Sequence, residues 1–467
     1  MSARAIFVGG TSSNAGKSWM ATAICAWLRS RGVAVAPFKA QNMSNNSYPC
    51  SHGGEIGRAQ VAQAEACGLE PEPAMNPVLL KPNGDGSSQV VVNGAVWKNL
   101  SAREYYTHAN ELRDHVLAAY AELAGRFEFI VIEGAGSISE LNLRDVDLAN
   151  LGLATRVGAP WILVADIERG GVFGSVIGTL GLLTQGERAL LRGFAINKFR
   201  GDRSLFDEGV RILESRTGAP CLGVFPFAED IALDAEDTLA INSRPDDSPP
   251  GGPSIAVIRL PCISNTTDFR LLKWAEWITQ PPQRDFDFII VPGSKSTIPD
   301  LRWLRDTGLA GWITGQHYRG AIIIGICGGF QMLGRTICDP AGAESPVRAA
   351  SGLGLLPVDT VMVPEKTTAL RMACSRGGVR FGAYEIHLGV TTSDQPMQPF
   401  ARLSDGRAEG ACVPGVIGTY LHGAFENADV CAETFRVDVG AVSKTVQYRR
   451  LGEWFSQHAT RLDVLGL

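Results

Sequence analysis

The feature that most constrains this chain is a glycine-rich segment near its start, residues 7–18, which reads FVGGTSSNAGKS. An apolar run precedes the segment and a helical spacing of apolar residues follows it, so we expect a strand, a loop and a helix in that order. In loops of this kind, backbone N–H groups and the positive end of the helix surround phosphate oxygens. The segment therefore predicts an α/β domain that binds a phosphate-bearing ligand.

The loop also supplies the candidate ligands for a nucleotide. Lys17 would reach the outer phosphates and Ser18 would hold Mg²⁺, while Thr11, Asn14 and Gly16 would form the phosphate cradle. Thr11 stands where the usual pattern has its first glycine, although two glycines directly before it keep the turn flexible. The alternative is an ordinary glycine turn in which Lys and Ser occur by chance.

Composition restricts the classes of protein to which this chain can belong. With 467 residues and 45% apolar content, the chain can form two or three domains with large cores. A net charge of -5 without a basic stripe argues against a nucleic-acid partner. No apolar run reaches the roughly 20 residues of a membrane span, and the chain starts without a signal peptide, so we expect a cytoplasmic protein. The ten cysteines form no C-x-x-C pair, which favours reduced thiols.

The first half of the chain alternates between β-like and helical patterns, which predicts a doubly wound parallel sheet. One of the apolar runs ends in Glu133, and an acid at such a strand tip is placed to bind Mg²⁺ or position water. A solvated loop acid is the alternative. Another run ends in Asn197 and Lys198, which resemble the dipeptide that reads the nucleotide base in other phosphate-loop proteins.

A change in composition separates this half from the rest. Residues 242–254 read NSRPDDSPPGGPS, a sequence that sustains neither a helix nor a strand. We therefore predict a phosphate-loop domain at residues 1–243, a linker at 244–253 and a second α/β domain at 254–467.

The second domain contains a candidate nucleophile. Cys327 lies between the apolar run AIIIGI and a helical stretch, FQMLGRTI, with two glycines directly after it. On such a tight turn, small neighbours allow the backbone to bend, and the start of the helix favours the thiolate. Downstream, another β-like run ends in His422, a base that could pair with the thiolate.

These motifs resemble known families. The segments GICGGFQMLG and GTYLHG are similar to class I glutamine amidotransferases, and GTSSNAGKS resembles the dethiobiotin-synthetase-like branch of phosphate-loop enzymes. Over nearly its whole length the chain resembles the cobyric acid synthase family of cobalamin biosynthesis. The departures are PCSHGG between Tyr48 and Glu55, and Ile138 where a proline is common. The further matching segments are PFKAQNMSNNS, EIGRAQ, LNLRDVDLANLG, ADIERGGVFGS, NKFRGD, LPCISNTTDF, PGSKST and YEIHLG.

The resemblance implies a ligase that uses ATP, Mg²⁺ and glutamine to amidate the b, d, e and g carboxylates of adenosylcobyrinic acid a,c-diamide. Cys327 and His422 would release ammonia from glutamine, and the phosphate loop would form an acyl phosphate. An internal passage would carry the ammonia between the domains. The partners are then the corrinoid polycarboxylate, glutamine and ATP, with the oligomeric state open. Basic residues that could meet the corrinoid or nucleotide are Lys39, Arg144, Arg169, Lys198 and Arg200.

The third member of the glutaminase site stays open at this point. Class I amidotransferases usually place Glu two residues after the histidine, and here that position is Ala424. Asp268, Glu385 and Glu426 are candidates to hold the second ring nitrogen of His422. We favour Asp268, because a loop after a parallel strand faces the same sheet edge as the cysteine. A pair oriented only by backbone is the alternative.

Competing functions were weighed on the same residues. Cobyrinic acid a,c-diamide synthase would share the architecture but act on other carboxylates. A partitioning-type ATPase switch would carry a lysine where this chain has Ser12. A non-catalytic amidotransferase-like scaffold is disfavoured by the presence of both Cys327 and His422.

Overall fold

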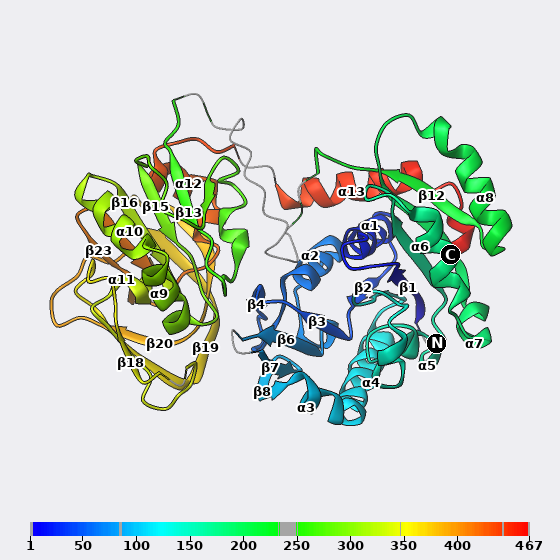
Figure 1. The fold of residues 1–467 in the computed structure, drawn as a ribbon, viewed down its shortest axis with the longest axis horizontal. Coiled ribbons are helices and arrows are strands. Elements are labelled where there is room, and N and C mark those ends of the chain that lie inside the picture. The colour runs from blue at the N-terminus through cyan, green and yellow to red at the C-terminus, as the bar shows by residue number, and fades with distance from the viewer. Residues whose placement is uncertain are drawn as a thin grey trace.

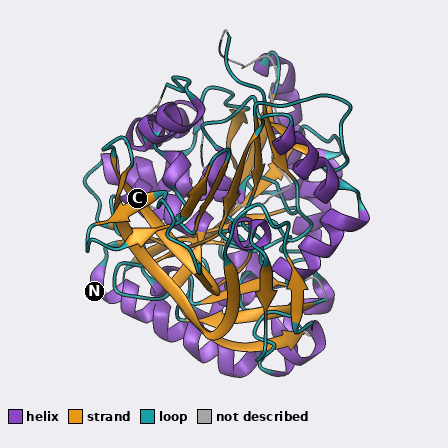
Figure 2. Cartoon of the chain, turned by 90° about the vertical axis from the view of Figure 1, so that its left-hand side faces the viewer, coloured by secondary structure: helices purple, strands orange, loops and turns teal. Residues whose placement is uncertain are grey.

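The computed structural model describes residues 3–83, 86–231, 233, 249, 251–345, 347–440 and 443–465. It contains two α/β lobes that lie side by side, each with strands inside and helices outside (Figures 1 and 2). Most of the predicted linker, residues 244–248 and 250, falls outside the described residues. Among the described helices, none is both long and apolar enough to cross a membrane.

The first lobe is built on a six-stranded sheet in the order β12-β11-β10-β1-β9-β2, and all its pairings are parallel. The predicted doubly wound sheet is thus confirmed. Its strands are β1 (Arg4–Gly10), β2 (Val35–Phe38), β9 (Phe129–Glu133), β10 (Trp161–Asp166), β11 (Leu191–Phe199) and β12 (Cys221–Pro226).

Alternation along the strands explains the two covered faces. In β1, Phe7 packs in one apolar cluster while Ile6 and Val8 pack in the other, on the opposite face. Helices α1 (Lys17–Ser30) and α2 (Arg58–Cys67) cover the Ile6 face. The opposite face carries α4 (Ala109–Arg126), α5 (Leu151–Arg156), α6 (Val172–Gly181) and α8 (Asp207–Thr217), and the short α7 (Gln185–Ala189) precedes β11.

The C-terminal helix corrects the predicted domain boundary. Helix α13 (Lys444–His458) packs on α1 of the first lobe, although the sequence assigned residues 254–467 to the second domain (Figure 1). The ring of Phe455 lies 5.5 Å from that of Trp27 and 5.7 Å from that of Phe225, which follows from the apolar face that α13 must bury. The chain therefore returns to the lobe in which it began.

Smaller strands of the first lobe lie toward the second lobe (Figure 1). They are β3 (Gln41–Met43), β6 (Val78–Pro82), β7 (Ser87–Val92) and β8 (Ala95–Ser101) in one sheet, and the pair β4 (Ser47–Pro49) and β5 (Glu55–Gly57). Residues 102–126 form two helices, α3 (Ala102–Thr107) and α4, which meet at His108, and Ser101 and Glu104 cap the start of α3.

The second lobe contains a six-stranded sheet in the order β14-β13-β15-β16-β24-β23, parallel except at β23. Its strands are β13 (Ile255–Ile258), β14 (Glu276–Ile278), β15 (Phe288–Val291), β16 (Ile322–Ile326), β23 (Ala411–Val413) and β24 (Val416–Thr419). Its helices are α9 (Thr297–Asp306), α10 (Leu309–Tyr318), α11 (Gly328–Leu333) and α12 (Ala428–Phe435).

A second sheet of this lobe contains the long hairpin β19–β20, which reaches the first lobe. The helix expected through Ile337 ends earlier, at Leu333, because Gly334 is extended and the β-branched Thr336 and Ile337 pair in β17. The strands of this sheet are β17 (Thr336–Cys338), β18 (Ala349–Ser351), β19 (Asp359–Ser375), β20 (Arg380–Thr392), β21 (Ala401–Leu403) and β22 (Ala408–Glu409).

Candidate functional site

The phosphate loop joins β1 to α1, as predicted, and two of its glycines are required by close approaches. Gly16 has φ +97°, and a Cβ there would lie 2.0 Å from Nδ2 of Asn197. A Cβ on Gly10 would lie 2.9 Å from Cδ of Lys17. Thr11 fits the turn without being glycine, because its φ is not positive, and its N–H donates to the carbonyl of Val164 at 3.0 Å.

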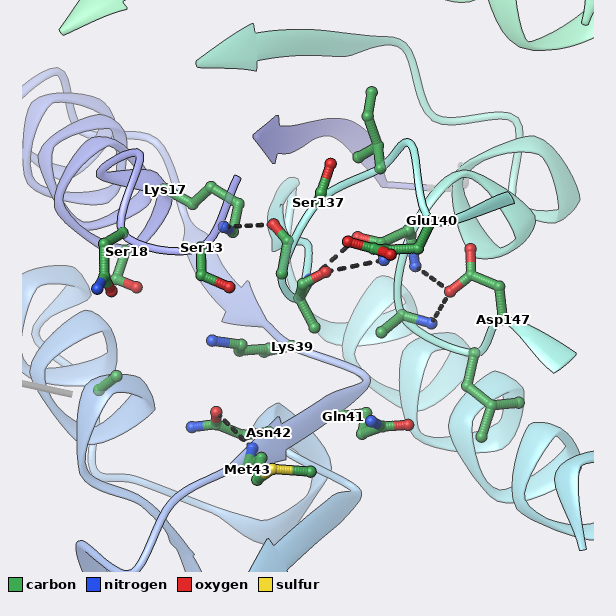
Figure 3. A pocket seen from close by; sticks show the side chains of 18 of the residues that line it. Ser13, Lys17, Ser18, Lys39, Gln41, Asn42, Met43, Ser137, Glu140 and Asp147 are labelled. Carbon is green, nitrogen blue, oxygen red and sulfur yellow. Dashed lines mark hydrogen bonds between the residues drawn. The ribbon is translucent and has the colours of Figure 1, made fainter. Parts of the chain in front are cut away.

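Lys17 crosses the mouth of this loop. Its ammonium donates to the carbonyl oxygens of Ser12 at 3.0 Å and Gly136 at 2.7 Å (Figure 3). The side chain is therefore held over the loop beside Ser13 and Ser137, where a phosphate oxygen of a nucleotide would meet it.

Glu133 lies behind the loop and is fully buried. One of its oxygens, Oε1, accepts from Oγ of Ser18 and from Nζ of Lys39, both at 2.7 Å, while Oε2 accepts from Nε2 of Gln63. Ser18 and Glu133, the predicted Mg²⁺ ligands, are thus adjacent. Lys39, expected to meet the corrinoid or nucleotide, instead pairs with Glu133.

A cavity of about 710 Å³ opens in front of these groups. Lys39, Arg144 and Lys198 line it, whereas Arg169 and Arg200 do not. Arg200 forms ion pairs with Glu168 and Glu229 instead. Figure 3 shows the lining from the loop, from the strand after Lys39 and from the segment around Asp147, whose carboxylate accepts from the N–H groups of residues 149, 150 and 152.

Both residues of the predicted nucleotide-reading pair lie against the loop, Asn197 buried and Lys198 half-buried. Nδ2 of Asn197 donates to the carbonyl of Ala15 at 3.0 Å, and Nζ of Lys198 donates to the carbonyl of Asn14 at 2.6 Å and to Asp166 at 2.9 Å. In this structure both side chains therefore support the phosphate loop, and reading of the base stays a prediction.

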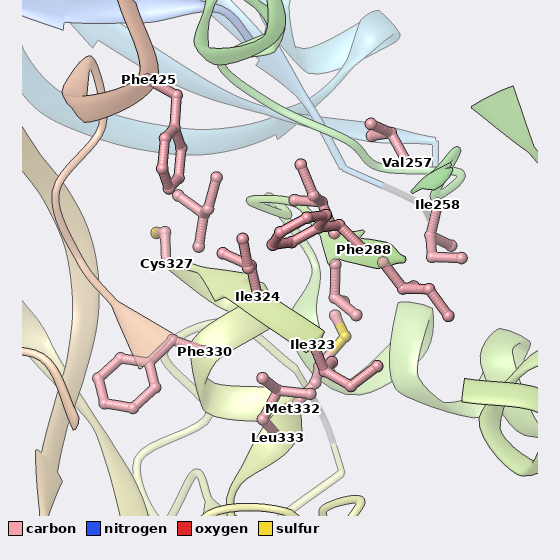
Figure 4. Close-up of a cluster of buried hydrophobic side chains, with 14 of the residues drawn as sticks. Val257, Ile258, Phe288, Ile323, Ile324, Cys327, Phe330, Met332, Leu333 and Phe425 are labelled. Atoms are coloured by element: carbon pink, nitrogen blue, oxygen red, sulfur yellow. The ribbon is translucent and has the colours of Figure 1, made fainter. Parts of the chain in front are cut away.

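The candidate nucleophile lies on the turn that the sequence indicated. Cys327 joins β16 to α11 with φ 53° and ψ -110°, a strained conformation for a residue with a side chain. Its N–H donates to the carbonyl of Thr419 at 2.7 Å, and a Cβ on Gly329 would lie 1.9 Å from the carbonyl oxygen of Val291. Figure 4 shows Cys327 at the end of β16, beyond the apolar core that contains Ile324.

Of the three candidate acids, the structure brings only Asp268 to the histidine. Oδ2 of Asp268 lies 2.7 Å from Nδ1 of His422, and Oδ1 accepts from the N–H of Gly423 at 2.6 Å. Glu385 pairs with Arg371, and Glu426 pairs with Arg58. The expected contact of Asp268 is therefore present.

The same contact determines the charge of the imidazole. Burial alone would lower the pKa of His422, but the carboxylate of Asp268 and the thiol of Cys327 outweigh burial and raise the pKa to about 10. His422 then carries a proton at neutral pH.

Comparison with known proteins finds a match for each half of the chain. A family model described as a CobB/CobQ-like glutamine amidotransferase domain matches residues 254–430, and one described as a CobQ/CobB/MinD/ParA nucleotide binding domain matches residues 6–240. A cobyric acid synthase of Parabacteroides distasonis is 44% identical, covering 97% of each chain. One of Rhodococcus jostii is 47% identical, covering 90% of this chain and 84% of its own length.

The chain belongs to the cobyric acid synthase family. Among solved structures, a glutamine amidotransferase is similar at 16% identity, with a TM-score of 0.31, over 46% of this chain and 99% of its own. In this member of the cobyric acid synthase family, all ten cysteines are free thiols, as expected.

The pocket around Cys327 contains residues that the sequence did not single out. It has a volume of about 40 Å³ and is lined by both lobes, with Asn45 and Lys81 from the first and Lys295, Gln331 and Glu344 from the second. Lys295 lies in the motif PGSKST, which could have indicated it. Glu344 comes from a loop without a pattern, so no sequence signal was available.

Helix α2, which begins with the last three residues of the EIGRAQ motif, lies between the two sites of the cobyric acid synthase architecture. At its start, Nη2 of Arg58 donates to both oxygens of Glu426, at 2.6 and 2.8 Å, four residues after His422. Further along α2, Gln63 donates to Glu133 beside the phosphate loop. One helix of the first lobe thus contacts Glu133 beside the phosphate loop and Glu426 in the segment that follows His422.

Proposed function

We propose that this protein amidates the b, d, e and g carboxylates of adenosylcobyrinic acid a,c-diamide, using ATP and glutamine, to give cobyric acid. Its membership of the cobyric acid synthase family makes it an ATP-dependent enzyme of glutamine-dependent amidation in cobalamin synthesis. The observation that carries the proposal is the presence, in one chain, of a phosphate-loop cavity and a buried Cys327–His422–Asp268 site.

The first lobe would activate the carboxylate. A carboxylate resists attack by ammonia because its leaving group is poor, and transfer of a phosphoryl group from ATP converts that leaving group into phosphate. Lys17 would bind the outer phosphate oxygens and the loop N–H groups would hold the others. The cavity of about 710 Å³ would place a corrinoid carboxylate opposite them, with Arg144 among its lining cations.

The residues at the loop fit a magnesium ion. The hydroxyl of Ser18 and the carboxylate of Glu133 are hard oxygen donors 2.7 Å apart, a set that Mg²⁺ accepts together with phosphate oxygens. The ion would neutralise charge on the phosphates. Lys39 lies on the same oxygen of Glu133 and would have to yield part of that contact.

The second lobe would release ammonia. The thiolate of Cys327 attacks the side-chain amide of glutamine, and a proton from His422 goes to the departing nitrogen, which leaves as ammonia. Water then cleaves the glutamyl thioester to give glutamate and restores the thiol. Asp268 would keep the imidazole in the orientation that both steps need.

Ammonia would then pass between the lobes. The polar segment of residues 41–47 contributes to both sites: Gln41 and Asn42 line the large cavity, and Asn45 lines the Cys327 pocket. This proximity supports a passage along the segment, where ammonia is shielded from bulk water.

The test is to incubate the protein, MgATP and glutamine with the a,c-diamide and to count the amides gained by mass spectrometry. Four added amides are expected. Amidation of the a and c positions of cobyrinic acid would instead identify the sister synthase, and ATP hydrolysis without amide formation would indicate an ATPase switch.

A further inference from the structure

The pocket around Cys327 contains a lysine that the reaction above does not use. Lys295 lines the pocket and is partly buried, yet within the described part of the chain its ammonium has no ion pair or hydrogen bond. The other two lysines of the lining differ, because Lys81 and Lys366 both pair with Glu55. Lys295 is therefore a cation that faces the nucleophile's pocket without a direct ion pair, although the nearby carboxylates of Glu344 and Glu55 partly offset the lowering of its pKa by burial.

The same pocket contains one carboxylate among its described lining residues, that of Glu344. The loop that contains it is fixed by the fully buried Asp339, whose oxygens accept from the N–H groups of Ala343, Glu344 and Ser345 at 2.7 to 2.9 Å. The Glu344 carboxylate accepts from the N–H and hydroxyl of Thr297, at the start of α9. It is thus held in place beside Lys295 without forming an ion pair with it.

We propose that Glu344 and Lys295 bind the two charged ends of free glutamine, Glu344 taking the α-ammonium and Lys295 the α-carboxylate, while the side-chain amide reaches Cys327. This assignment rests on the proposed glutaminase function and names the part of the pocket that selects a free amino acid. A substrate with both charges satisfies both residues at once, whereas one that lacks either charge leaves a partly buried ion without a partner.

The ionisation of the two residues agrees with this geometry. Burial raises the pKa of Glu344 to about 7, and burial together with the charge of Lys366 lowers the pKa of Lys295. Each charged form is destabilised in the protein alone, and a ligand of opposite charge would stabilise it. Because Glu344 takes up a proton as the pH falls below about 7, the KM for glutamine should rise there.

The experiment measures hydrolysis of three amides, with glutamine as the reference. 4-Carbamoylbutanoate lacks the α-ammonium, and glutamine α-amide lacks the α-carboxylate. The wild-type protein should prefer glutamine to each by about tenfold or more in kcat/KM, a difference of roughly 1.4 kcal/mol. Equal use of all three amides would overturn the assignment, and this comparison needs no variant to fold.

Two variants then assign each charge to its residue. Glu344→Gln should raise the KM for glutamine about tenfold and leave the KM for 4-carbamoylbutanoate nearly unchanged. Lys295→Met should also raise the KM for glutamine about tenfold, but it should leave the KM for glutamine α-amide nearly unchanged. Lys273→Met and Asp306→Asn, exposed positions of the same lobe, are the matched charge controls. Melting temperatures verify folding. A loss that is equal for all three amides in either variant would contradict the assignment.

The outcome is separable from that of the proposed function. The hydrolysis assay follows the acid formed and needs neither ATP nor corrinoid. Selectivity for glutamine without amidation of the corrinoid would refute the proposed substrate but uphold the role of this pocket. Amidation of the corrinoid by a protein that hydrolyses all three amides equally well would uphold the proposed substrate but refute the role of this pocket.

Discussion

The two candidate sites of this molecule differ in openness and in the number of lobes that build them. The phosphate-loop cavity has a volume of about 710 Å³ and its described lining comes from the first lobe. The Cys327 pocket has only about 40 Å³ and is closed by Asn45 and Lys81 of the other lobe. The large cavity suits the proposed corrinoid substrate, which needs room. The small pocket suits the proposed release of ammonia, which must be kept from water.

The comparison also separates two kinds of catalysis. In the proposed mechanism, cations and backbone N–H groups of the first lobe would surround the phosphates, so positioning and charge neutralisation would dominate there. In the second lobe, the proposed covalent chemistry would depend on the strained Cys327 and on the buried contact of His422 with Asp268.

The variant Cys327→Ala should separate the roles of the two sites most clearly. Glutamine-dependent amidation should fall by about 10⁴-fold or more, because no thioester forms. Amidation with a high concentration of ammonium salts should persist, since the first lobe is unchanged. The measurement is the rate of amide formation with each nitrogen source, with Cys338→Ala as a control. Equal loss with both sources in a folded variant would show that the division of labour is wrong.

Lys17→Ala tests the phosphate-loop site of the first lobe. Amidation should fall by about 10³-fold with either nitrogen source, because the phosphates lose their principal cation. Hydrolysis of glutamine alone should continue. Rates of amidation and of glutamate release measure the two effects, with the exposed Lys98→Ala as the matched control. Near-normal amidation with ammonium would remove the loop from the mechanism.

Asp268→Asn tests how the closed pocket orients its base. Glutaminase turnover should fall by about 10²-fold, because the imidazole loses the acceptor that fixes its tautomer. Glu385→Gln and Glu426→Gln, the other two candidates, should cost far less. If either of those variants reduces turnover tenfold or more while Asp268→Asn does not, the assignment from the structure fails.

The pH dependence of Asp268→Asn sharpens the same test. In the folded protein the pKa of His422 is raised to about 10, so the stabilisation from its protonated form is complete below pH ~6.5 and is lost as the pH rises towards 10. The variant should lose this stabilisation. Its melting temperature should therefore change less than that of the wild type between pH 6.5 and 10.

Arg58→Met examines the connection between the sites. Arg58 pairs with Glu426, and its guanidinium lies 4.9 Å from the ring of Tyr48 and 5.8 Å from that of Tyr384, which stacks on His422. Removing the charge leaves Glu426 without its closest partner, so glutaminase turnover should fall about tenfold. Turnover of glutamate release measures this, with the exposed Arg211→Met as control. Unchanged turnover would make the contact purely structural.

The smallest effect is expected from Asn197→Ala. The KM for ATP should rise several-fold, about three to ten times, because the variant loses the support of Ala15 in the phosphate loop and any contact with the base. Glutamine hydrolysis should be almost unaffected. Initial rates against ATP concentration provide the measurement, and an unchanged dependence on ATP would limit Asn197 to a packing role.

Local sequence patterns were sufficient to predict much of the fold and of the two candidate sites. The glycine-rich loop before Lys17 and the turn at Cys327 are fixed by short-range requirements, namely backbone room and the start of a helix, so the sequence predicted both. Continuous apolar runs separated by helical segments predicted the parallel sheets, because a strand covered by helices on both faces must be apolar on both faces. The preference for Asp268 followed from the rule that loops after parallel strands share an edge.

The remaining features depended on contacts between distant residues. Nothing in the local pattern of residues 444–458 shows that they pack on α1, because an amphipathic helix does not specify which lobe receives its apolar face. Lys39 appeared available for a substrate until the structure placed it on Glu133. The presence of Lys295 and Glu344 in one pocket was likewise invisible, since the two residues are brought together only by the packing of a loop on α9. The sequence by itself thus determined the elements and their chemistry, and tertiary packing decided which charges became neighbours, because burial and pairing are properties of the folded chain.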